Sequence, residues 1–346
     1  MRRLEELVRE NIYRLKPYSS ARSEFKGEAS VFVDANENPY DTLYNRYPDP
    51  LQTKLKEKLS ALKGVSAENI FLGVGSDEAI DLLYRIFCEP RRDNVVAIDP
   101  TYGMYGVCAD INEVEYRSVR LDEKFDIDVE ALFASVDANT KLIWLCSPNN
   151  PTGNSLSTDR IKNIIGRFDG IVVLDEAYID FSAYPSFLSE LHNYPNLVIL
   201  QTFSKAWGSA GVRLGMAFAD KQIIGIFNKV KYPYNINILT QRYAVKLLDK
   251  APAVKRRVAE IIRNRGVLEK QLRKYSCIKE IYPSDSNFLL VSTTGAKDIY
   301  NYLVEAGIIV RNRHGITLCD ECLRITVGTR DEISKISAAL AAYDKK

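Results

Sequence analysis

The segment "LQTFSKAWGSAGVRLGM" covers residues 200–216 of this 346-residue chain and begins with the pattern of an apolar strand. The strand pattern stops at Ser204-Lys205, and mostly small residues follow as far as Arg213. A lysine at a strand end is either a solvated loop residue or an amine held in a partly desolvated crevice. Desolvation disfavours the ammonium form, so such an amine can condense with a carbonyl. The neighbouring segments decide between these two interpretations.

Composition excludes several classes of function. The 47 basic and 45 acidic residues nearly cancel, and this balance predicts no nucleic-acid partner. No apolar run approaches the roughly 20 residues that span a bilayer, and the basic start lacks the apolar core of a signal peptide. We therefore expect a cytoplasmic protein with no membrane partner. With only two histidines and one CxxC pair (Cys319 and Cys322), we expect neither a metal site nor a histidine-based triad, and we attribute His314 and the CxxC pair to loop variation.

The central part of the chain alternates short apolar segments with helical ones, such as residues 158–167. Strands that are apolar on both faces and alternate with helices indicate an α/β fold with a mostly parallel sheet between helices. The predicted strands lie in "NIFLGVG" (69–75), "VVAIDP" (95–100), "KLIWLCSP" (141–148), "IVVLDEAY" (171–178), "NLVILQTFS" (196–204) and "LGMAFA" (214–219).

The flanking segments predict a second, smaller α+β domain. We expect helices over residues 4–15, over 51–64 with its end at Gly64, over 238–275 with a break near Ala251-Pro252, over 296–306 and at the end of the chain. Further strands are expected in "IKEIYP" (278–283), "NFLLVST" (287–293), "GIIV" (307–310) and "LRITVG" (323–328). The predicted division is an N-terminal arm (1–28), a small domain (29–45 and 246–346) and a large domain (46–245).

Polar residues follow four of the predicted central strands. These strand ends are "GVGSDE" (73–78), "SPNNPTG" (147–153), "LDEAY" (174–178) and "TFSK" (202–205). Ligands of such sheets collect outside the carboxyl ends of the strands, so we expect the four ends to face one crevice. A lysine Schiff base is most useful with pyridoxal phosphate, which also needs an acid against its ring nitrogen and a phosphate cradle. The sequence offers a candidate for each.

Three side chains are candidates for contacts with the ring. Asp175 ends an apolar strand, where a protonated ring nitrogen would pair its carboxylate; alternatively it is a helix cap or turn residue. Tyr178 is placed to give its hydroxyl to the phenolic oxygen of the ring. Asn150 is placed to donate to the same oxygen, although "NNPTG" is also an ordinary turn sequence.

The phosphate cradle is expected at the start of a helix. Free N–H groups and the helix dipole at Gly75, Ser76 and Asp77 suit a dianion, although Asp77 and Glu78 would equally cap an ordinary helix. Tyr102 either stacks on the ring or packs in the core. The residues that would complete the cradle are Thr202, Ser204 and Arg213, the last with a planar charged fork.

With "NNPTG", "DEAY" and "SK…R" in this order, the chain resembles the fold-type I pyridoxal-phosphate enzymes of the class I/II aminotransferase group over nearly its whole length. Asn150, Asp175, Tyr178, Lys205 and Arg213 fall on the motif of that group. More narrowly, the chain resembles the subfamily that transaminates histidinol phosphate. The strings behind this narrower resemblance include "LKPYSSAR" (15–22), "DANENPY" (34–40), "NRYPDP" (45–50), "PTYGMY" (100–105), "GIIVRNR" (307–313) and "LRITVGTRDE" (323–332).

The resemblance implies reversible amino transfer between L-histidinol phosphate and 2-oxoglutarate in histidine biosynthesis, giving imidazole-acetol phosphate and L-glutamate. It makes Lys205 the cofactor anchor and acid–base group, with Asp175 and Tyr178 beside it. It also implies a homodimer with shared active sites, in which Tyr47 reaches the cofactor phosphate of the partner subunit. Tyr18, Arg311 and Arg324 would handle the anionic groups of the substrates, although an internal salt bridge is an alternative for Arg324.

Other functions on the same fold stay open: an aromatic amino acid aminotransferase or a threonine-phosphate decarboxylase. A regulator that kept the cofactor would normally add a DNA-binding helix-turn-helix unit, and the first 50 or so residues have no such pattern.

Overall fold

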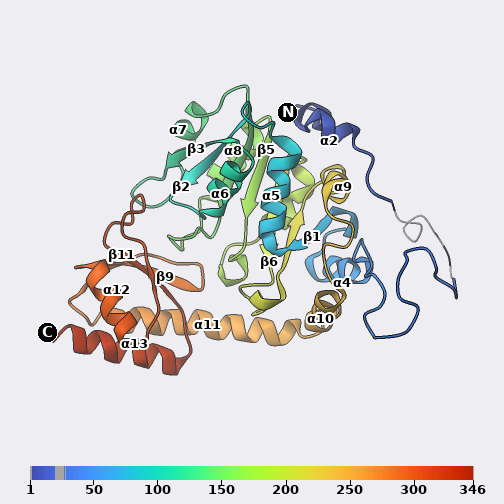
Figure 1. Ribbon diagram of the computed structural model, residues 1–346. Helices are drawn as coiled ribbons and strands as arrows, with labels where there is room; N and C mark the ends of the chain where they lie inside the picture. The colour runs from blue at the N-terminus through green and yellow to red at the C-terminus, as the bar shows by residue number, and fades with distance from the viewer. Residues whose placement is uncertain (1, 20–26, 28, 346) are drawn as a thin grey trace.

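The computed structural model describes residues 2–19, 27 and 29–345 and consists of two sheets joined by the long helix α11 (Ala251–Leu272) (Figure 1). Seven strands of the described chain form the larger sheet in the order β1–β7–β6–β5–β4–β2–β3. Their bounds are β1 (Ile70–Val74), β2 (Asn94–Asp99), β3 (Glu115–Arg120), β4 (Thr140–Cys146), β5 (Ile171–Asp175), β6 (Leu197–Thr202) and β7 (Leu214–Phe218). Only β7 runs antiparallel to its neighbours, which confirms the predicted mostly parallel sheet.

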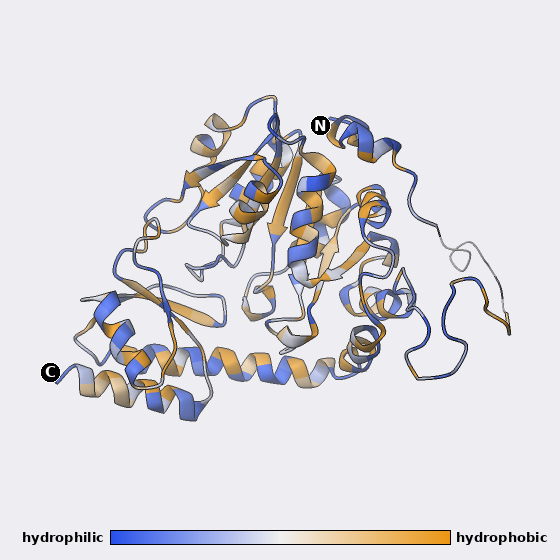
Figure 2. Cartoon of the chain, viewed as in Figure 1, coloured by the Kyte–Doolittle hydropathy of each residue, from blue (hydrophilic) through white to orange (hydrophobic). Residues whose placement is uncertain are grey.

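Both faces of this sheet are buried, as the apolar strand sequences predict. Along β2, Val95 and Ala97 belong to one hydrophobic cluster, and Val96 and Ile98 belong to the other. Helices α5 (Gly75–Phe87), α6 (Met104–Ile111) and α9 (Lys221–Val230) pack in the first cluster, whereas α4 (Thr53–Lys63), α8 (Thr158–Arg167) and α10 (Ile238–Leu248) pack in the second. Figure 2 shows the hydrophobic strands between helices that each have a polar and an apolar side.

The large-domain prediction missed one strand. Edge strand β3 is mostly exposed or half-exposed, and its sequence "EYRSVR" has no apolar run that would predict it. The predicted helix end at Gly64 is confirmed, since this glycine takes a left-handed conformation (φ +69°) and its N–H donates to the Ser60 carbonyl oxygen. The short helix α7 (Val129–Ala134) lies in the connection that leads to β4.

The second sheet is antiparallel, in the order β10–β11–β9–β8. Its strands are β8 (Ile278–Ile281), β9 (Phe288–Thr293), β10 (Arg311–Asn312) and β11 (Cys322–Thr326), and its helices are α12 (Ala296–Glu305) and α13 (Arg330–Tyr343). The predicted strand "GIIV" is wrong, because residues 307–310 are irregular and pairing begins only at Arg311. The break in the predicted helix 238–275 is confirmed between α10 and α11.

The N-terminal segment differs from its prediction. Instead of one helix over 4–15 it forms two, α1 (Leu4–Leu7) and α2 (Glu10–Arg14), separated at Val8 and Arg9. Leu7 and Val8 are buried in the hydrophobic cluster that contains α5, so the first part of the predicted arm packs onto the large domain of its own chain. Residues 29–45 contain neither helix nor strand, and Figure 1 shows them near α4 and α10, far from the smaller sheet. The predicted domain boundaries remain predictions.

The described residues contain neither a membrane-spanning helix nor a metal-binding cluster of side chains. No helix in this part of the chain has the length and apolar character to cross a membrane. No group of three or more His, Cys, Asp or Glu side chains in the same part is placed to hold a metal ion. Cys319 and Cys322 are buried free thiols, and Nδ1 of His314 accepts a hydrogen bond from the Glu321 N–H at 3.2 Å.

Candidate active site

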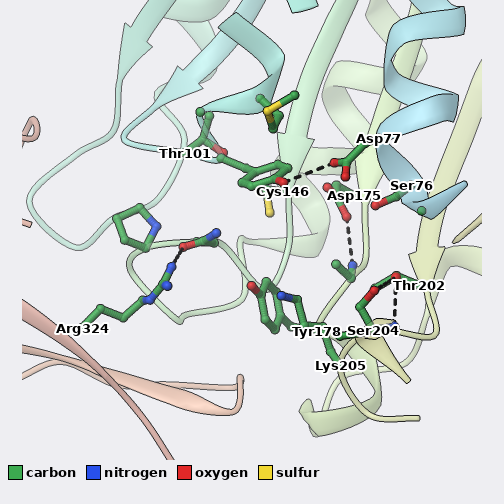
Figure 3. A pocket seen from close by; sticks show the side chains of 18 of the residues that line it. Ser76, Asp77, Thr101, Cys146, Asp175, Tyr178, Thr202, Ser204, Lys205 and Arg324 are labelled. Atoms are coloured by element: carbon green, nitrogen blue, oxygen red, sulfur yellow. Dashed lines mark hydrogen bonds between the residues drawn. The ribbon is translucent and has the colours of Figure 1, made fainter. Parts of the chain in front are cut away.

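One edge of the large sheet collects the carboxyl ends of β1, β2, β4, β5 and β6, and the start of the antiparallel β7. A cavity of about 710 Å³ opens at this edge, with three arginines of the smaller domain on its other side. Figure 3 shows side chains from both domains around it, Arg324 on one side and Lys205 on the other. Thirteen of the residues predicted from the sequence line this cavity: Gly75, Ser76, Asp77, Tyr102, Asn150, Asp175, Tyr178, Thr202, Ser204, Lys205, Arg213, Arg311 and Arg324.

Lys205 follows β6 on a turn and reaches into the cavity, where Nζ lies 5.5 Å from the centroid of the Tyr178 ring. Desolvation by the surrounding protein, followed by the charge of Arg324, lowers the pKa of Lys205. A lowered pKa favours the neutral amine, which is the form that attacks a carbonyl or accepts a proton from carbon. The geometry therefore suits the covalent anchor predicted from the sequence.

Asp175 is the last residue of β5 and only 2% exposed. Its Oδ2 accepts a hydrogen bond from the Tyr105 hydroxyl at 2.7 Å, and its Oδ1 accepts one from the Ala177 N–H at 3.0 Å. Burial raises the pKa of Asp175 to about 6, against the opposing effect of these two donors. No described side-chain cation lies within ion-pair distance of this carboxylate, so a protonated ring nitrogen in the cavity would supply a partner.

Tyr105 is a site residue that the sequence prediction missed. It is fully buried, stacks on Trp144 with ring centroids 4.7 Å apart, and meets Tyr102 edge to face at 5.6 Å. Tyr102 precedes α6 and Tyr105 lies in its first turn, and no pattern in "PTYGMY" distinguishes Tyr105 from an ordinary core aromatic residue.

The start of α5 and the start of β7 form one compact unit. The Gly75 N–H donates to the Arg213 carbonyl oxygen at 3.0 Å, and both residues have left-handed backbone conformations (φ +71° and +54°). The left-handed backbone at Gly75 favours glycine, and a Cβ there would lie 2.6 Å from Nη2 of Arg213, so the guanidinium would have to move. The first N–H groups of α5, the Arg213 fork and the nearby hydroxyls of Thr202 and Ser204 are donors that suit a phosphate.

The side chain of Asp77 contacts Arg213 and Tyr102 and does not suit a direct contact with phosphate. Its Oδ2 accepts from Nη2 of Arg213 at 3.1 Å, and its Oδ1 accepts from the Tyr102 hydroxyl at 3.2 Å. A carboxylate repels a phosphate, so the side chain of Asp77 orients a guanidinium and a ring, while its backbone N–H remains available at the helix start.

Arg324 faces the same cavity from β11. Its Nη1 donates to Oδ1 of Asn150, which leaves the Asn150 amino group to act as a donor toward the cavity. Burial lowers the pKa of Arg324, and its Nε is buried without a hydrogen-bond partner. Among the described residues Arg324 has no carboxylate within ion-pair distance, so the structure does not support an internal salt bridge.

Tyr18 and Tyr47 lie outside the cavity of their own chain. Tyr18 is 73% exposed, and Tyr47 is 51% exposed and stacks on Tyr234 with ring centroids 4.4 Å apart. The family resemblance places Tyr47 in the site of a partner subunit. Their roles, like those of the residues that line the cavity, remain predictions.

A buried carboxylate and a reactive lysine at the strand ends of such a sheet define the fold-type I class of pyridoxal-phosphate enzymes. Residues 28–340 match the family model of aminotransferase class I and II, and the chain belongs to this family. The family and the fold class predicted from the sequence are thus confirmed.

Proteins that carry the name histidinol-phosphate aminotransferase are similar to this chain along nearly its full length. The histidinol-phosphate aminotransferase of Bacteroides thetaiotaomicron is 61% identical over 344 residues, and the alignment covers 99% of both chains. The enzyme of the same name from Cytophaga hutchinsonii is 52% identical, with 98% of this chain and 99% of that protein covered. Among solved structures, histidinol-phosphate aminotransferase from Sinorhizobium meliloti in complex with pyridoxal-5'-phosphate superposes with a TM-score of 0.80 at 25% identity, covering 87% of this chain and 83% of that one.

Proposed function

We propose that this chain is a histidinol-phosphate aminotransferase, which uses pyridoxal phosphate to transfer an amino group reversibly between L-histidinol phosphate and 2-oxoglutarate. The observation that carries the proposal is the placement of Lys205 and the buried carboxylate of Asp175, which has no ion-pair partner among the described residues, in one cavity with Arg324 opposite. The choice of substrate is supported by relatives at 52–61% identity that bear this name along their full length.

Each residue has a part in this reaction. Bound pyridoxal phosphate supplies an electron-withdrawing ring that makes the proton on the amine-bearing carbon of the substrate acidic. The Lys205 amine, with its lowered pKa, accepts that proton and returns it to a different carbon as a general acid. Asp175 holds the ring nitrogen protonated, and Arg324 with Asn150 orients an anionic group of the substrate.

The proposal includes a homodimer in the cytoplasm with active sites shared between subunits. Support for an interface comes from apolar side chains that this chain leaves exposed along the segment before Tyr47, since contiguous apolar patches mark interaction surfaces. These are Val31 (72%), Val33 (88%), Tyr40 (78%), Leu43 (68%) and Tyr44 (55%). All six cysteines are buried free thiols, which suits a reducing compartment.

The test of the proposed function is a comparison of substrates and variants. Purified protein is expected to absorb visible light and to turn over histidinol phosphate with 2-oxoglutarate. Lys205→Ala should lower turnover at least about 10³-fold, because it removes both the anchor and the acid–base group. Lys221→Ala, at the exposed start of α9, is the matched control and should behave as wild type.

The alternatives give different results in the same assay. Preferred turnover of phenylalanine would favour an aromatic aminotransferase, and release of carbon dioxide from threonine phosphate would favour the decarboxylase. A protein that takes up no pyridoxal phosphate at all would contradict the whole assignment.

A further inference from the structure

Lys231 is a buried lysine that the proposed reaction does not use. It directly follows α9, and its Nζ donates to the carbonyl oxygens of Pro50 at 2.8 Å, Pro233 at 3.0 Å and Tyr232 at 3.1 Å. Burial lowers the pKa of Lys231 to about 8. A buried amine costs free energy unless its N–H groups find acceptors, so the three carbonyl groups hold Lys231, and Lys231 in turn ties two distant segments together.

The two segments that Lys231 ties together carry a pair of stacked tyrosines. Tyr47 lies three residues before Pro50, and Tyr234 directly follows Pro233. Their ring centroids are 4.4 Å apart, and the ring planes are inclined by only 13°. Tyr47 is half exposed, and the Tyr234 ring covers one of its faces. The position of the Tyr47 ring therefore depends on the segments that Lys231 holds.

Asn235 connects the second of these segments to the start of α5. Its Oδ1 accepts from Nζ of Lys231 at 3.3 Å, and its Nδ2 donates to the Leu72 carbonyl oxygen of β1 at 2.9 Å. The same Nδ2 lies 3.1 Å from Oε2 and 3.2 Å from Oε1 of Glu78, in the first turn of α5. Glu78 also accepts from the Val74 N–H, at the point where β1 passes into α5. A continuous set of hydrogen bonds thus leads from Lys231 to the helix start whose N–H groups form the proposed phosphate cradle.

In the proposed dimer the two ends of this set of hydrogen bonds would serve different sites. The start of α5 would bind the cofactor phosphate of its own chain, whereas Tyr47 would reach the cofactor phosphate of the other chain. We propose that Lys231 and Asn235 are positioning residues that hold Tyr47 in a fixed place relative to α5, so that each chain carries phosphate-binding elements of both sites as one rigid unit. This inference rests on the proposed function and adds two residues to it.

The first test is the affinity of the cofactor-free protein for pyridoxal phosphate, titrated by visible absorbance. Tyr47→Phe removes the proposed hydrogen bond to the phosphate and should raise Kd by roughly 10- to 100-fold. Lys231→Met keeps the length of the side chain without its N–H groups and should raise Kd by about 10-fold. Because Lys231 acts through Tyr47, the double variant should be weaker than Tyr47→Phe by no more than about threefold. Asn235→Ala should raise Kd by at least about threefold, and it tests the inference independently if Lys231→Met does not fold.

Heterodimers show in which of the two sites the effect appears. Each dimer pairs a Lys205→Ala chain, which lacks the cofactor anchor, with a chain that keeps Lys205, so one complete site remains to be titrated. With Lys231→Met on the Lys205→Ala chain, the complete site receives its Tyr47 from the altered chain, and Kd should rise by about 10-fold. With Lys231→Met on the other chain, the complete site receives an unaltered Tyr47, and Kd should change by less than about threefold. A merely structural role would weaken the site on the same chain instead.

Lys141→Met is the matched control. Lys141 is buried to a similar extent but lies at the start of β4, at the opposite edge of the large sheet from the cavity, so its loss should leave Kd unchanged. Unchanged Kd in both Lys231→Met and Asn235→Ala, or equal effects in the two heterodimers, would overturn the inference. If Tyr47→Phe acts on the site of the other chain and Lys231→Met does not, the inference fails and the proposed function stands. A wild-type protein that takes up no pyridoxal phosphate would reject both.

Discussion

At the scale of single residues, the ionised state of Asp175 depends on how two opposing effects balance. Burial raises the pKa of this carboxyl group to about 6, whereas the hydrogen bonds from the Tyr105 hydroxyl and the Ala177 N–H stabilise the charged form. A hydrogen bond to a charged group contributes roughly 1.5–3 kcal/mol, which corresponds to about one to two pKa units. In the proposed function, Tyr105 is therefore a positioning residue that keeps Asp175 able to pair with a protonated ring nitrogen.

Tyr105→Phe should raise the pKa of Asp175 further, because it removes a donor that favours the carboxylate. Since the proposed role of this carboxylate is to hold the cofactor, affinity for pyridoxal phosphate should be lost at a higher pH as the solution is acidified. We expect the midpoint of this loss to move up by about one pH unit, measured by equilibrium dialysis and by the acid limb of the pH–kcat/KM profile.

Tyr116→Phe is the matched control for this experiment. Tyr116 is a partly buried tyrosine on β3 that packs near α6 without lining the cavity, so its removal should leave both midpoints in place. A Tyr105→Phe protein with unshifted midpoints would show that the 2.7 Å hydrogen bond has no influence on Asp175.

The residues at strand ends could be predicted from the sequence because each follows an apolar run that fixes its position in the sheet. Lys205 and Asp175 are examples, and both line the cavity. Tyr105 and Lys231 were missed because their proposed roles arise only from contacts between elements distant in sequence. Tyr105 meets a carboxylate 70 residues away, and Lys231 donates to a carbonyl oxygen 181 residues away.

At the scale of secondary-structure elements, the closest packing near the site is between β7 and the start of α5. A Cβ added at Gly215 would lie 2.1 Å from the backbone nitrogen of Ser76 and 2.2 Å from the carbonyl carbon of Gly75. These are backbone atoms, which cannot move aside as a flexible side chain can. The glycine in "LGMAFA" therefore permits the approach that forms the proposed phosphate cradle.

Gly215→Ala should destabilise the protein by about 1–3 kcal/mol or more and weaken pyridoxal phosphate binding, because the two elements must move apart. Gly225→Ala in α9 provides a comparison, since its Cβ would have no atom within 4 Å. It should be neutral or stabilise by up to about 1 kcal/mol, because alanine favours the helix. Urea denaturation and cofactor titration would measure both effects, and equal stability of the two variants would contradict the packing argument.

The elements themselves were predictable to the extent that their sequences show one clear periodicity. Helix α8 matches the predicted residues 158–167, and the buried strands match their apolar runs. Strand β3 failed because it lies at an exposed edge, and "GIIV" failed because its residues form an irregular connection in which Ile309 is 74% exposed and only Val310 is buried. The N-terminal helix failed at Val8 and Arg9, where the backbone is extended.

At the scale of the whole molecule, the proposed shared active site makes a quantitative prediction. A Tyr47→Ala protein and a Lys205→Ala protein should each be inactive, whereas a heterodimer of the two contains one intact site. Random exchange of equal amounts makes half of all dimers mixed, so about one quarter of wild-type activity should return. Activity would be measured after refolding the two proteins together, and verified heterodimers without activity would exclude an interface site.

The two halves of the cavity belong to different sheets, and α11 is the rigid connection between them. Its 22 residues make a rod roughly 33 Å long. Val254 and Val258 in its first half pack in a hydrophobic cluster of the large sheet, whereas Leu268 and Leu272 in its second half pack in the cluster of the smaller sheet. None of the cavity-lining residues belongs to α11, yet a substitution that changed how either half packs would change how closely Arg324 approaches Lys205.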